Sequence, residues 1–464
     1  MKGKILEQLT IIDIADEGRA LGRHNGLVIF VNHALPGDVV DVLITRKKNS
    51  YVEGHVVRQH VSSPHRIEAF CKHFGVCGGC KWQHMDYSTQ LMFKQKQVLD
   101  AMQRLGNIIT PNVLPIVAAE PTRFYRNKLD FSFAHRKWMM PEDFDKEDTT
   151  LIPALGFHIP GKFDKVLDID ECYLQPEPSN SIRLSIKKYA VEHDLPFMNI
   201  RNKAGLLRSL IIRSTLKGDV MVVVMVYENN QEQLEKLLNH ISHEFPQITS
   251  LMYVINTKAN DTMHDLEVQL FKGDPYITEQ MEDLNFRIHP KSFFQTNPTQ
   301  AILLYQIARD FAQLTGNEFV YDLYTGTGTI ANFVARHSKK VVGIEYVKEA
   351  IDDAKLNSSL NNISNTEFYA GDMKDLLTEG FFNEMGKPDV IITDPPRAGM
   401  HVDVIQKLLN SGAKRIVYVS CNPATQARDI NLLMDKYEVE KLQPVDMFPH
   451  THHVENVALL NFKD

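Results

Sequence analysis

The sequence predicts an α/β protein with a Rossmann-like C-terminal domain, preceded by an N-terminal OB-like β-barrel and a central β-rich region. From about residue 290, hydrophobic strand patterns alternate with helical segments, which is typical of a doubly wound parallel sheet. The first part of the chain consists instead of short alternating segments separated by turn signals. At 464 residues the chain is too long for one ordinary domain, so two or three are expected.

The composition is that of a folded protein, with 43% hydrophobic and 23% charged residues. Polar residues interrupt every hydrophobic run, and the N-terminus lacks the pattern of a secretory signal, so we expect a cytoplasmic protein with no membrane segment. The net charge of −7 argues against a protein that coats nucleic acid non-specifically. An RNA enzyme with a local basic patch stays compatible with that charge.

Residues 1–62 are expected to form the barrel. Five short strands at this spacing suit an OB-like fold, which often binds single-stranded nucleic acid. Arg46, Lys47, Lys48 and Arg58 are candidates to contact phosphates, and a solvated hairpin tip would explain them equally well.

Residues 63–112 and 113–289 are expected to form the central region. Strand-like segments dominate it, with one helical stretch near residues 230–243. Its period-two pattern, with interspersed Arg and Lys, predicts an antiparallel sheet with one working face.

Residues 290–464 hold five hydrophobic strand patterns, each followed by a helical or loop segment, and two further β segments. After the first strand, residues 321–329 read Tyr-Asp-Leu-Tyr-Thr-Gly-Thr-Gly-Thr and open a helix. Such a tight turn lets backbone N–H groups approach a ligand at a helix N-terminus. The full dinucleotide pattern G-x-G-x-x-G is absent, which argues against NAD.

Acidic residues follow the next two strands. Glu345 ends the second strand, where a carboxylate can accept hydrogen bonds from ribose hydroxyls. Asp372 ends the third strand and is placed to reach an adenine amino group. The alternative interpretation is a nucleotide-free turn flanked by surface acids.

Three further polar positions follow later strands or begin the last one. Asp394 opens Asp-Pro-Pro-Arg-Ala-Gly, a rigid loop at the edge where open α/β sheets bind ligands. Cys421 lies beside that loop and near a helix N-terminus, which predicts a lowered thiol pKa. Glu455, at the start of the last strand, is the leading candidate for a general base. The alternatives are a stiff turn, a small buried thiol and a solvated carboxylate.

The other cysteines suggest a metal centre. Cys71, Cys77 and Cys80 cluster, and Cys172 lies far downstream. Disulfides are rare in cytosolic chains, so these four thiols could ligate one centre. Soft sulfur sites suit zinc or iron–sulfur, and spacing alone leaves both open.

Four late motifs carry a resemblance to a known family. Gln295 within FFQTN, Asp394 within DPPRAG, Cys421 within SCNP and Glu455 within HHVENVALL together resemble the RNA uracil-5-methyltransferases. The closest branch looks like the ribosomal-RNA enzymes with an N-terminal TRAM barrel and an iron–sulfur cluster, and the resemblance spans essentially the whole chain. It implies a class I methyltransferase domain that uses S-adenosyl-L-methionine to methylate C5 of a uridine in RNA, giving 5-methyluridine.

The resemblance also implies roles for particular residues. Cys421 would add to C6 of uracil, which makes C5 nucleophilic toward a methyl group, and Glu455 would remove the C5 proton. At position 329 some relatives carry asparagine, so the threonine of this chain is a departure. Contacts to the cofactor or the target base are implied for Gln295, Tyr324, Thr329, Glu345, Asp372 and Asp394.

For the four clustered cysteines the resemblance implies a 4Fe-4S cluster with a folding or RNA-docking role, with zinc as the alternative. The expected partner is 23S ribosomal RNA, bound by a monomeric enzyme with the target base flipped into the pocket. Lys81, Trp82, His84 and Arg126 are candidates to present basic and aromatic groups to that RNA.

Several other functions stay open from the sequence. One is a uracil-5-methyltransferase acting on tRNA, and another is an N-directed RNA methyltransferase, since Asp-Pro-Pro loops also position exocyclic amines. A cytosine-5 enzyme uses two cysteines near its site, whereas only Cys421 is left over here. A non-catalytic RNA-binding assembly factor is disfavoured by the intact set of Cys421, Asp394 and Glu455.

Overall fold

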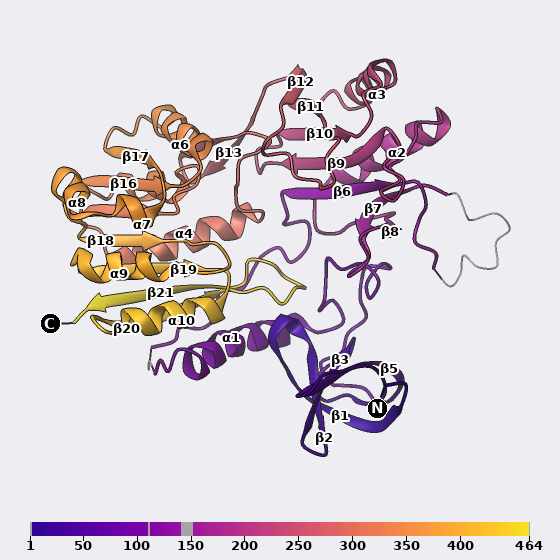
Figure 1. The fold of residues 1–464 in the computed structure, drawn as a ribbon, viewed down its shortest axis with the longest axis horizontal. Coiled ribbons are helices and arrows are strands. Elements are labelled where there is room, and N and C mark those ends of the chain that lie inside the picture. The colour runs from indigo at the N-terminus through magenta and orange to yellow at the C-terminus, as the bar shows by residue number, and fades with distance from the viewer. Residues whose placement is uncertain (1, 110–111, 141–151, 464) are drawn as a thin grey trace.

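The computed structural model describes residues 2–109, 112–140 and 152–463. Its three main parts are a small barrel, a seven-stranded central sheet and a seven-stranded C-terminal sheet flanked by helices (Figure 1). The predicted α/β fold class, with its N-terminal barrel, is confirmed. Among the described residues, no helix is both long and apolar enough to cross a membrane.

The N-terminal barrel closes in the strand order β1-β2-β3-β5-β4. β3 and β5 run parallel, and the other neighbouring strands run antiparallel. Alternate side chains fill the interior, where Ile29, Val40 and Val52 are fully buried. The elements are β1 (Ile5–Ile14), the 3-10 turn η1 (Asp16–Gly18), β2 (Ala20–His24), β3 (Leu27–Asn32), β4 (Val39–Lys47) and β5 (Tyr51–Val61).

The central sheet has the strand order β12-β11-β10-β9-β6-β7-β8. It is antiparallel except for β10 and β11, which run parallel. Its strands are β6 (Lys128–Ala134), β7 (Ala154–His158), β8 (Val166–Asp168), β9 (Leu207–Ser214), β10 (Val220–Val226), β11 (Ser250–Ile255) and β12 (Val268–Gly273).

The middle strands of this sheet are buried, and one face of β6 and β9 lines a cavity through alternate residues such as Asp130 and Ser209, as expected for a sheet with one working face. Every residue of β9 and β10 is buried. On one face Val222 shares a core with helices α2 (Ser179–Glu192) and α3 (Gln231–Glu244). On the other face Val223 joins the core of the C-terminal part. Helix α3 was predicted and α2 was not.

The C-terminal sheet has the order β17-β16-β15-β18-β19-β21-β20. It is parallel from β17 to β19, and β21 runs antiparallel to both of its neighbours. Its strands are β15 (Phe319–Leu323), β16 (Lys340–Glu345), β17 (Thr366–Ala370), β18 (Val390–Thr393), β19 (Arg415–Ser420), β20 (Tyr437–Val445) and β21 (Glu455–Phe462). The five predicted parallel strands and the two closing β segments are confirmed.

Helices flank the C-terminal sheet on both faces (Figure 1). They are α4 (Pro298–Ala312), α5 (Thr329–Ala335), α6 (Lys348–Leu360), α7 (Met373–Leu376), α8 (Glu379–Met385), α9 (Val402–Ser411) and α10 (Pro423–Leu433). The hairpin of β13 (Ile277–Met281) and β14 (Leu284–Ile288) also packs here, because Asn361 and Asn357 of the α6 region accept hydrogen bonds from its backbone at 2.8 and 2.9 Å.

Helix α1 (Tyr87–Arg104) joins the cysteine-bearing segment to the C-terminal part. It lies beside α10, between that helix and the barrel (Figure 1). The chain after it forms parallel bridges from Val113 to Leu442 and from Val117 to Val445 on β20. The N-terminal third of the chain is therefore anchored directly on the C-terminal sheet.

Candidate active site

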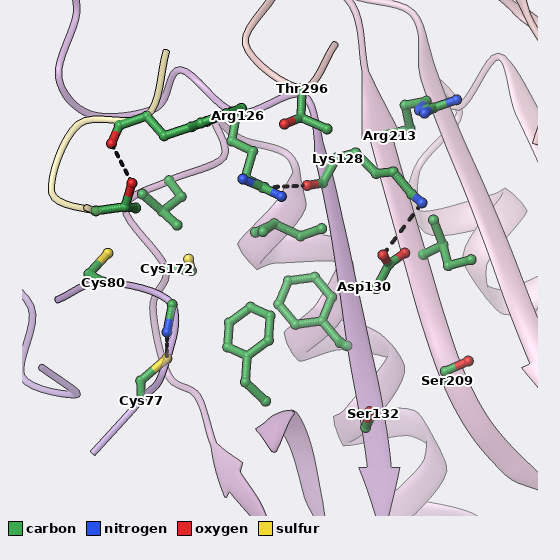
Figure 2. Close-up of a pocket in the computed structure, with 18 of the residues that line it drawn as sticks. Cys77, Cys80, Arg126, Lys128, Asp130, Ser132, Cys172, Ser209, Arg213 and Thr296 are labelled. Carbon is green, nitrogen blue, oxygen red and sulfur yellow. Dashed lines mark hydrogen bonds and ion pairs between the residues drawn. The ribbon is translucent and has the colours of Figure 1, made fainter. Parts of the chain in front are cut away.

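A cavity of about 930 Å³ is lined by residues of the central sheet and of the C-terminal part. Cys421 and Glu455 line it together with the four clustered cysteines. Figure 2 shows Lys128 and Asp130 on β6 along one side, with Cys77, Cys80 and Cys172 on the other. The structure thus brings the two predicted catalytic residues and the predicted metal-binding cysteines to one cavity.

Cys421 sits in the short turn between β19 and α10. Asn422 caps α10, because its side-chain oxygen accepts a hydrogen bond from the Ala424 N–H at 3.1 Å. The side-chain Nδ2 of Asn422 donates to the carbonyl oxygen of Arg397 at 3.0 Å, and the Thr425 hydroxyl donates to the same oxygen at 3.2 Å. The Asp-Pro-Pro loop that contains Arg397 is therefore tied to the turn that carries Cys421.

Glu455 reaches the same place from the neighbouring strand. In the antiparallel pairing of β19 with β21, Ser420 lies opposite Asn456. Cys421 and Glu455 are each one residue beyond that pair, at the same end of the two strands. Glu455 is only 4% exposed. Burial, and next the charge of Asp394, raise the pKa of Glu455 to about 8. Burial raises the pKa of Asp394 to about 7.

The expected lowering of the Cys421 pKa is wrong for the protein without its ligands. Burial raises the pKa of this thiol to about 12, and the charges of Glu455 and Asp394 add to the effect. Arg397 opposes the rise. The helix N-terminus is therefore outweighed, and a thiolate at Cys421 needs a cation or a bound substrate to offset the two carboxyl groups.

Gln295 meets this cluster through a residue that the sequence analysis missed. The Gln295 side chain acts on the hydroxyl of Tyr305, on α4, and lowers the pKa of that hydroxyl against the effect of burial. Burial raises the pKa of Tyr305, and Asp394, Asp322 and Glu455 are among the charges that raise it further. Tyr305 is 5% exposed and occupies an apolar stripe of its helix, so no sequence signal distinguished it from core.

The predicted cofactor loop follows β15 and is held by a second missed residue, Asp322. Its buried carboxylate accepts hydrogen bonds from the Thr325 hydroxyl at 2.5 Å and the Ala331 N–H at 2.9 Å. Within the part of the chain that the structure describes, the other oxygen of this carboxylate is buried without a hydrogen-bond partner. Burial raises the pKa of Asp322 to about 7. An unmet acceptor beside the loop is a feature that a bound ligand could satisfy.

Glu345 supports the tip of the loop. Its carboxylate accepts hydrogen bonds from the backbone N–H of Gly326 at 3.3 Å and of Val347 at 3.0 Å. Gly326 adopts a positive φ of 54°, and a Cβ there would meet nothing within 4 Å. Tyr346, beside Glu345, is 70% exposed and was not predicted from sequence. The loop therefore offers open space next to an acid and an aromatic ring.

The remaining predicted cofactor residues surround this loop. Burial raises the pKa of Tyr324 to about 12, and the charge of Asp372 adds to the rise. Asp372 caps α7, where it accepts a hydrogen bond from the Lys374 N–H at 3.1 Å. Thr329 is 8% exposed, and its hydroxyl lies 3.3 Å from that of Thr327. The hydroxyl of Thr329 therefore contacts another residue of the same loop.

The comparisons with known proteins match this arrangement. Residues 201–463 match the family described as tRNA (uracil-5-)-methyltransferase, and residues 1–57 match the TRAM domain. The chain belongs to the RNA uracil-5-methyltransferase family. It is an S-adenosylmethionine-dependent enzyme that acts on uracil C5 in RNA, as the family membership shows.

Relatives of this methyltransferase are similar over their whole length. An uncharacterized RNA methyltransferase of Bacteroides thetaiotaomicron is 56% identical, over 97% of this chain and 100% of the relative. Another from Porphyromonas gingivalis is 55% identical over 97% and 99%. The Pyrococcus abyssi tRNA (uracil-54, C5)-methyltransferase, solved with S-adenosyl-L-homocysteine, aligns with a TM-score of 0.75 and 28% identity over 98% of this chain and 100% of that one.

In this methyltransferase the four clustered cysteines influence one another. Burial raises the pKa of Cys77 to about 11 and of Cys80 to about 12, and the charges of the other thiols contribute to both shifts. The Gly79 N–H donates to the sulfur of Cys77 at 3.5 Å. Within the described ranges, no group of three or more His, Cys, Asp or Glu side chains is arranged to hold a metal ion. The thiols are neighbours without enclosing one ion.

Two of the predicted RNA-contacting side chains are not available for that role. Trp82 is 2% exposed and packs at the junction between the barrel and α1. His84 is 7% exposed, and its ring lies 5.0 Å from that of Phe74. Arg126 does line the cavity, where its Nε donates to the Lys128 carbonyl at 3.0 Å (Figure 2). On the barrel, the Arg46 side chain is 59% exposed.

Proposed function

We propose that Cys421 is the covalent nucleophile of this methyltransferase and Glu455 its general base. The observation that carries the proposal is their placement one residue beyond the Ser420–Asn456 pair of β19 and β21, in one cavity. A thiol and a buried carboxyl group that face the same space fit a reaction in which one adds to a base and the other removes a proton.

The chemical steps follow from the low nucleophilicity of uracil C5, which rises when a thiolate adds to C6. The Cys421 thiolate forms a bond to C6, and the electrons of the C5–C6 double bond move to give an enolate. C5 then attacks the methyl group of S-adenosylmethionine, and S-adenosylhomocysteine leaves. Glu455 takes the proton from C5, the C5–C6 double bond re-forms, and the Cys421 thiolate is released. A flipped-out uridine is required for this access.

When bound, S-adenosylmethionine would supply the methyl group, and its positive sulfonium would favour the Cys421 thiolate. We propose that the loop after β15 binds it. The open space at Gly326, the unmet acceptor of Asp322 and the exposed ring of Tyr346 support this assignment. The residues assigned to the cofactor or the target base are Gln295, Tyr324, Thr329, Glu345, Asp372 and Asp394.

We further propose that Cys71, Cys77, Cys80 and Cys172 hold a 4Fe-4S cluster, with zinc as the alternative. Four thiolates bound at about 2.3 Å from one zinc would have to converge closely. All four cysteines line one cavity, and the charges of the other thiols act on Cys77 and Cys80, which supports a shared group with sulfur ligands. Its role would be structural, since the methylation steps are polar.

We propose 23S ribosomal RNA as the substrate, which would place the reaction in the cytoplasm. The support for this branch is the resemblance carried by Gln295, Asp394, Cys421 and Glu455 together with the cysteine set. The names of the matching family and of the Pyrococcus abyssi relative favour tRNA as the second candidate. Incubation of unmodified 23S ribosomal RNA and unmodified tRNA with labelled S-adenosylmethionine separates the two. Methylation of tRNA alone would contradict the proposal.

A further inference from the structure

The segment between β20 and β21 directly precedes Glu455, and it is bound by residues of the N-terminal part of the protein. At its start, the ammonium group of Lys94, on α1, is fully buried against the Asp446 carboxylate at 2.5 Å and the Phe448 carbonyl at 2.9 Å. The Tyr87 hydroxyl donates to the same carboxylate at 2.9 Å. Helix α1 thus fixes the first residues of this segment.

The middle of the segment is held by the residues that follow the cysteines. The His450 N–H donates to the Gln90 side chain at 2.9 Å. The His450 carbonyl accepts the N–H groups of Lys81 and Trp82 at 2.9 and 3.0 Å. The Tyr125 hydroxyl donates to the Pro449 carbonyl at 3.0 Å. The backbone of this segment is therefore fixed by residues that lie more than three hundred positions earlier in the sequence.

The end of the segment is covered by the barrel. Gly18, in η1, lies so close to His452 that a Cβ at this glycine would be 2.6 Å from the His452 Cβ. The Gly18 carbonyl accepts the Trp82 indole N–H at 3.1 Å, and the Lys81 ammonium donates to the Glu17 carbonyl at 2.9 Å. His452 is three residues before Glu455, and its neighbour His453 lines the active-site cavity.

We propose that the TRAM barrel, through Gly18, positions the 446–453 segment and thereby Glu455. Gly18 is a positioning residue, since it acts through His452 and touches no reacting atom. The barrel would then have a second task besides any contact with RNA, which is to keep the base aligned with the target ring. This inference rests on the proposed role of Glu455.

Two glycines of the barrel provide a matched test. Gly18 has φ +71° and no room for a Cβ, whereas Gly26 has φ +77° and nothing within 4 Å. Alanine imposes a similar backbone strain at both positions, but only Gly18→Ala presses on His452. The same Cβ would lie 3.0 Å from the Nε1 of Trp82, whose N–H donates to the Gly18 carbonyl, so both neighbours of the segment are affected. With RNA substrate, Gly18→Ala is expected to lower kcat by about tenfold or more, which corresponds to a barrier change near 1.4 kcal/mol. KM for RNA and the affinity for S-adenosylmethionine should change little.

The pH profile separates positioning from general destabilisation. If Gly18→Ala displaces Glu455, the midpoint of the kcat profile should shift, whereas Gly26→Ala should retain the wild-type midpoint. Lys81→Met, which removes the contact to Glu17 without filling space, is a second variant in case Gly18→Ala folds poorly. It is expected to lower kcat in the same direction and by less.

The outcomes are distinguishable from a failure of the proposed function. Glu455→Gln serves as the reference, and if it retains full activity the role of Glu455 itself is wrong. If Glu455→Gln is inactive but Gly18→Ala matches Gly26→Ala in kcat and pH midpoint, the positioning role of the barrel is overturned. A rise in KM for RNA with unchanged kcat in Gly18→Ala also overturns it, because the barrel would then act in RNA binding alone.

Discussion

The charge of Asp394 acts on the buried carboxyl group of Glu455, where it adds to the effect of burial and raises the pKa of Glu455 to about 8. The pKa of Asp394 is itself raised by burial to about 7. Because the two negative charges disfavour each other, the two groups do not both ionise readily at neutral pH. Glu455 is therefore largely protonated at pH 7 in the free enzyme and becomes available as a base at higher pH.

This pair predicts the pH dependence of the reaction. Only ionised Glu455 can accept a proton, so kcat/KM should rise as the pH increases from about 6 to about 9. Asp394→Asn removes a charge that raises the pKa of Glu455, so the rise should move to lower pH even if the rate falls. Initial rates of methyl incorporation across this range measure both midpoints. An unchanged midpoint in Asp394→Asn would show that the two groups are not coupled.

Replacement of the proposed base should trap the reaction on the enzyme. In Glu455→Gln the C5 proton cannot be removed, so the Cys421 adduct cannot be eliminated, and turnover should fall by about 10²–10⁴-fold. A protein–RNA complex that survives denaturing electrophoresis should accumulate. The double variant with Cys421→Ala should form no such complex, and a complex in that control would exclude Cys421 as the attachment point.

The cofactor loop offers a test that does not depend on RNA. Gly328 has φ +75° and its Cβ would lie 2.8 Å from the Ala354 Cβ, whereas Gly412 has φ +71° with nothing within 4 Å. Gly328→Ala should weaken S-adenosylmethionine binding by about tenfold or more, and Gly412→Ala should leave it unchanged. Calorimetric titration measures both. Equal affinities in the two variants would argue against this loop as the binding site.

The proposed cluster predicts the metal content of the protein. Chain purified without oxygen should contain about four iron and four sulfide per molecule, and Cys80→Ser should lose both along with visible absorption. Cys421→Ala is the matched control, because it removes a thiol outside the set and should retain the iron. About one zinc and no sulfide would favour the alternative site.

The sequence predicted those features that local patterns encode. The buried parallel strands β15, β16, β18 and β19 are nearly continuous apolar runs, which makes them visible without a structure. Helix α2 was missed although Ile182, Ile186 and Ala190 recur at four-residue spacing and are fully buried. The surrounding strand patterns masked a helical period that was present in the sequence.

The parts of the site that were not predicted depend on contacts between distant segments. The sequence suggested a lowered pKa for Cys421 from the adjacent helix, whereas Glu455 and Asp394, brought in by other strands, raise it. Trp82 looked available to RNA, yet the barrel covers it. The ion pair between Lys94 and Asp446 joins residues 352 positions apart, and no local sequence pattern predicts such a contact.

The central claim is that this enzyme methylates uracil C5 through a Cys421 adduct. The most direct measurement uses unmodified ribosomal RNA tritiated at uridine C5, with S-adenosylmethionine and either wild-type or Cys421→Ala protein. The account predicts that the wild type releases one tritium for each methyl group transferred and that Cys421→Ala releases none. Methyl transfer without tritium release would contradict it and would indicate methylation at another atom.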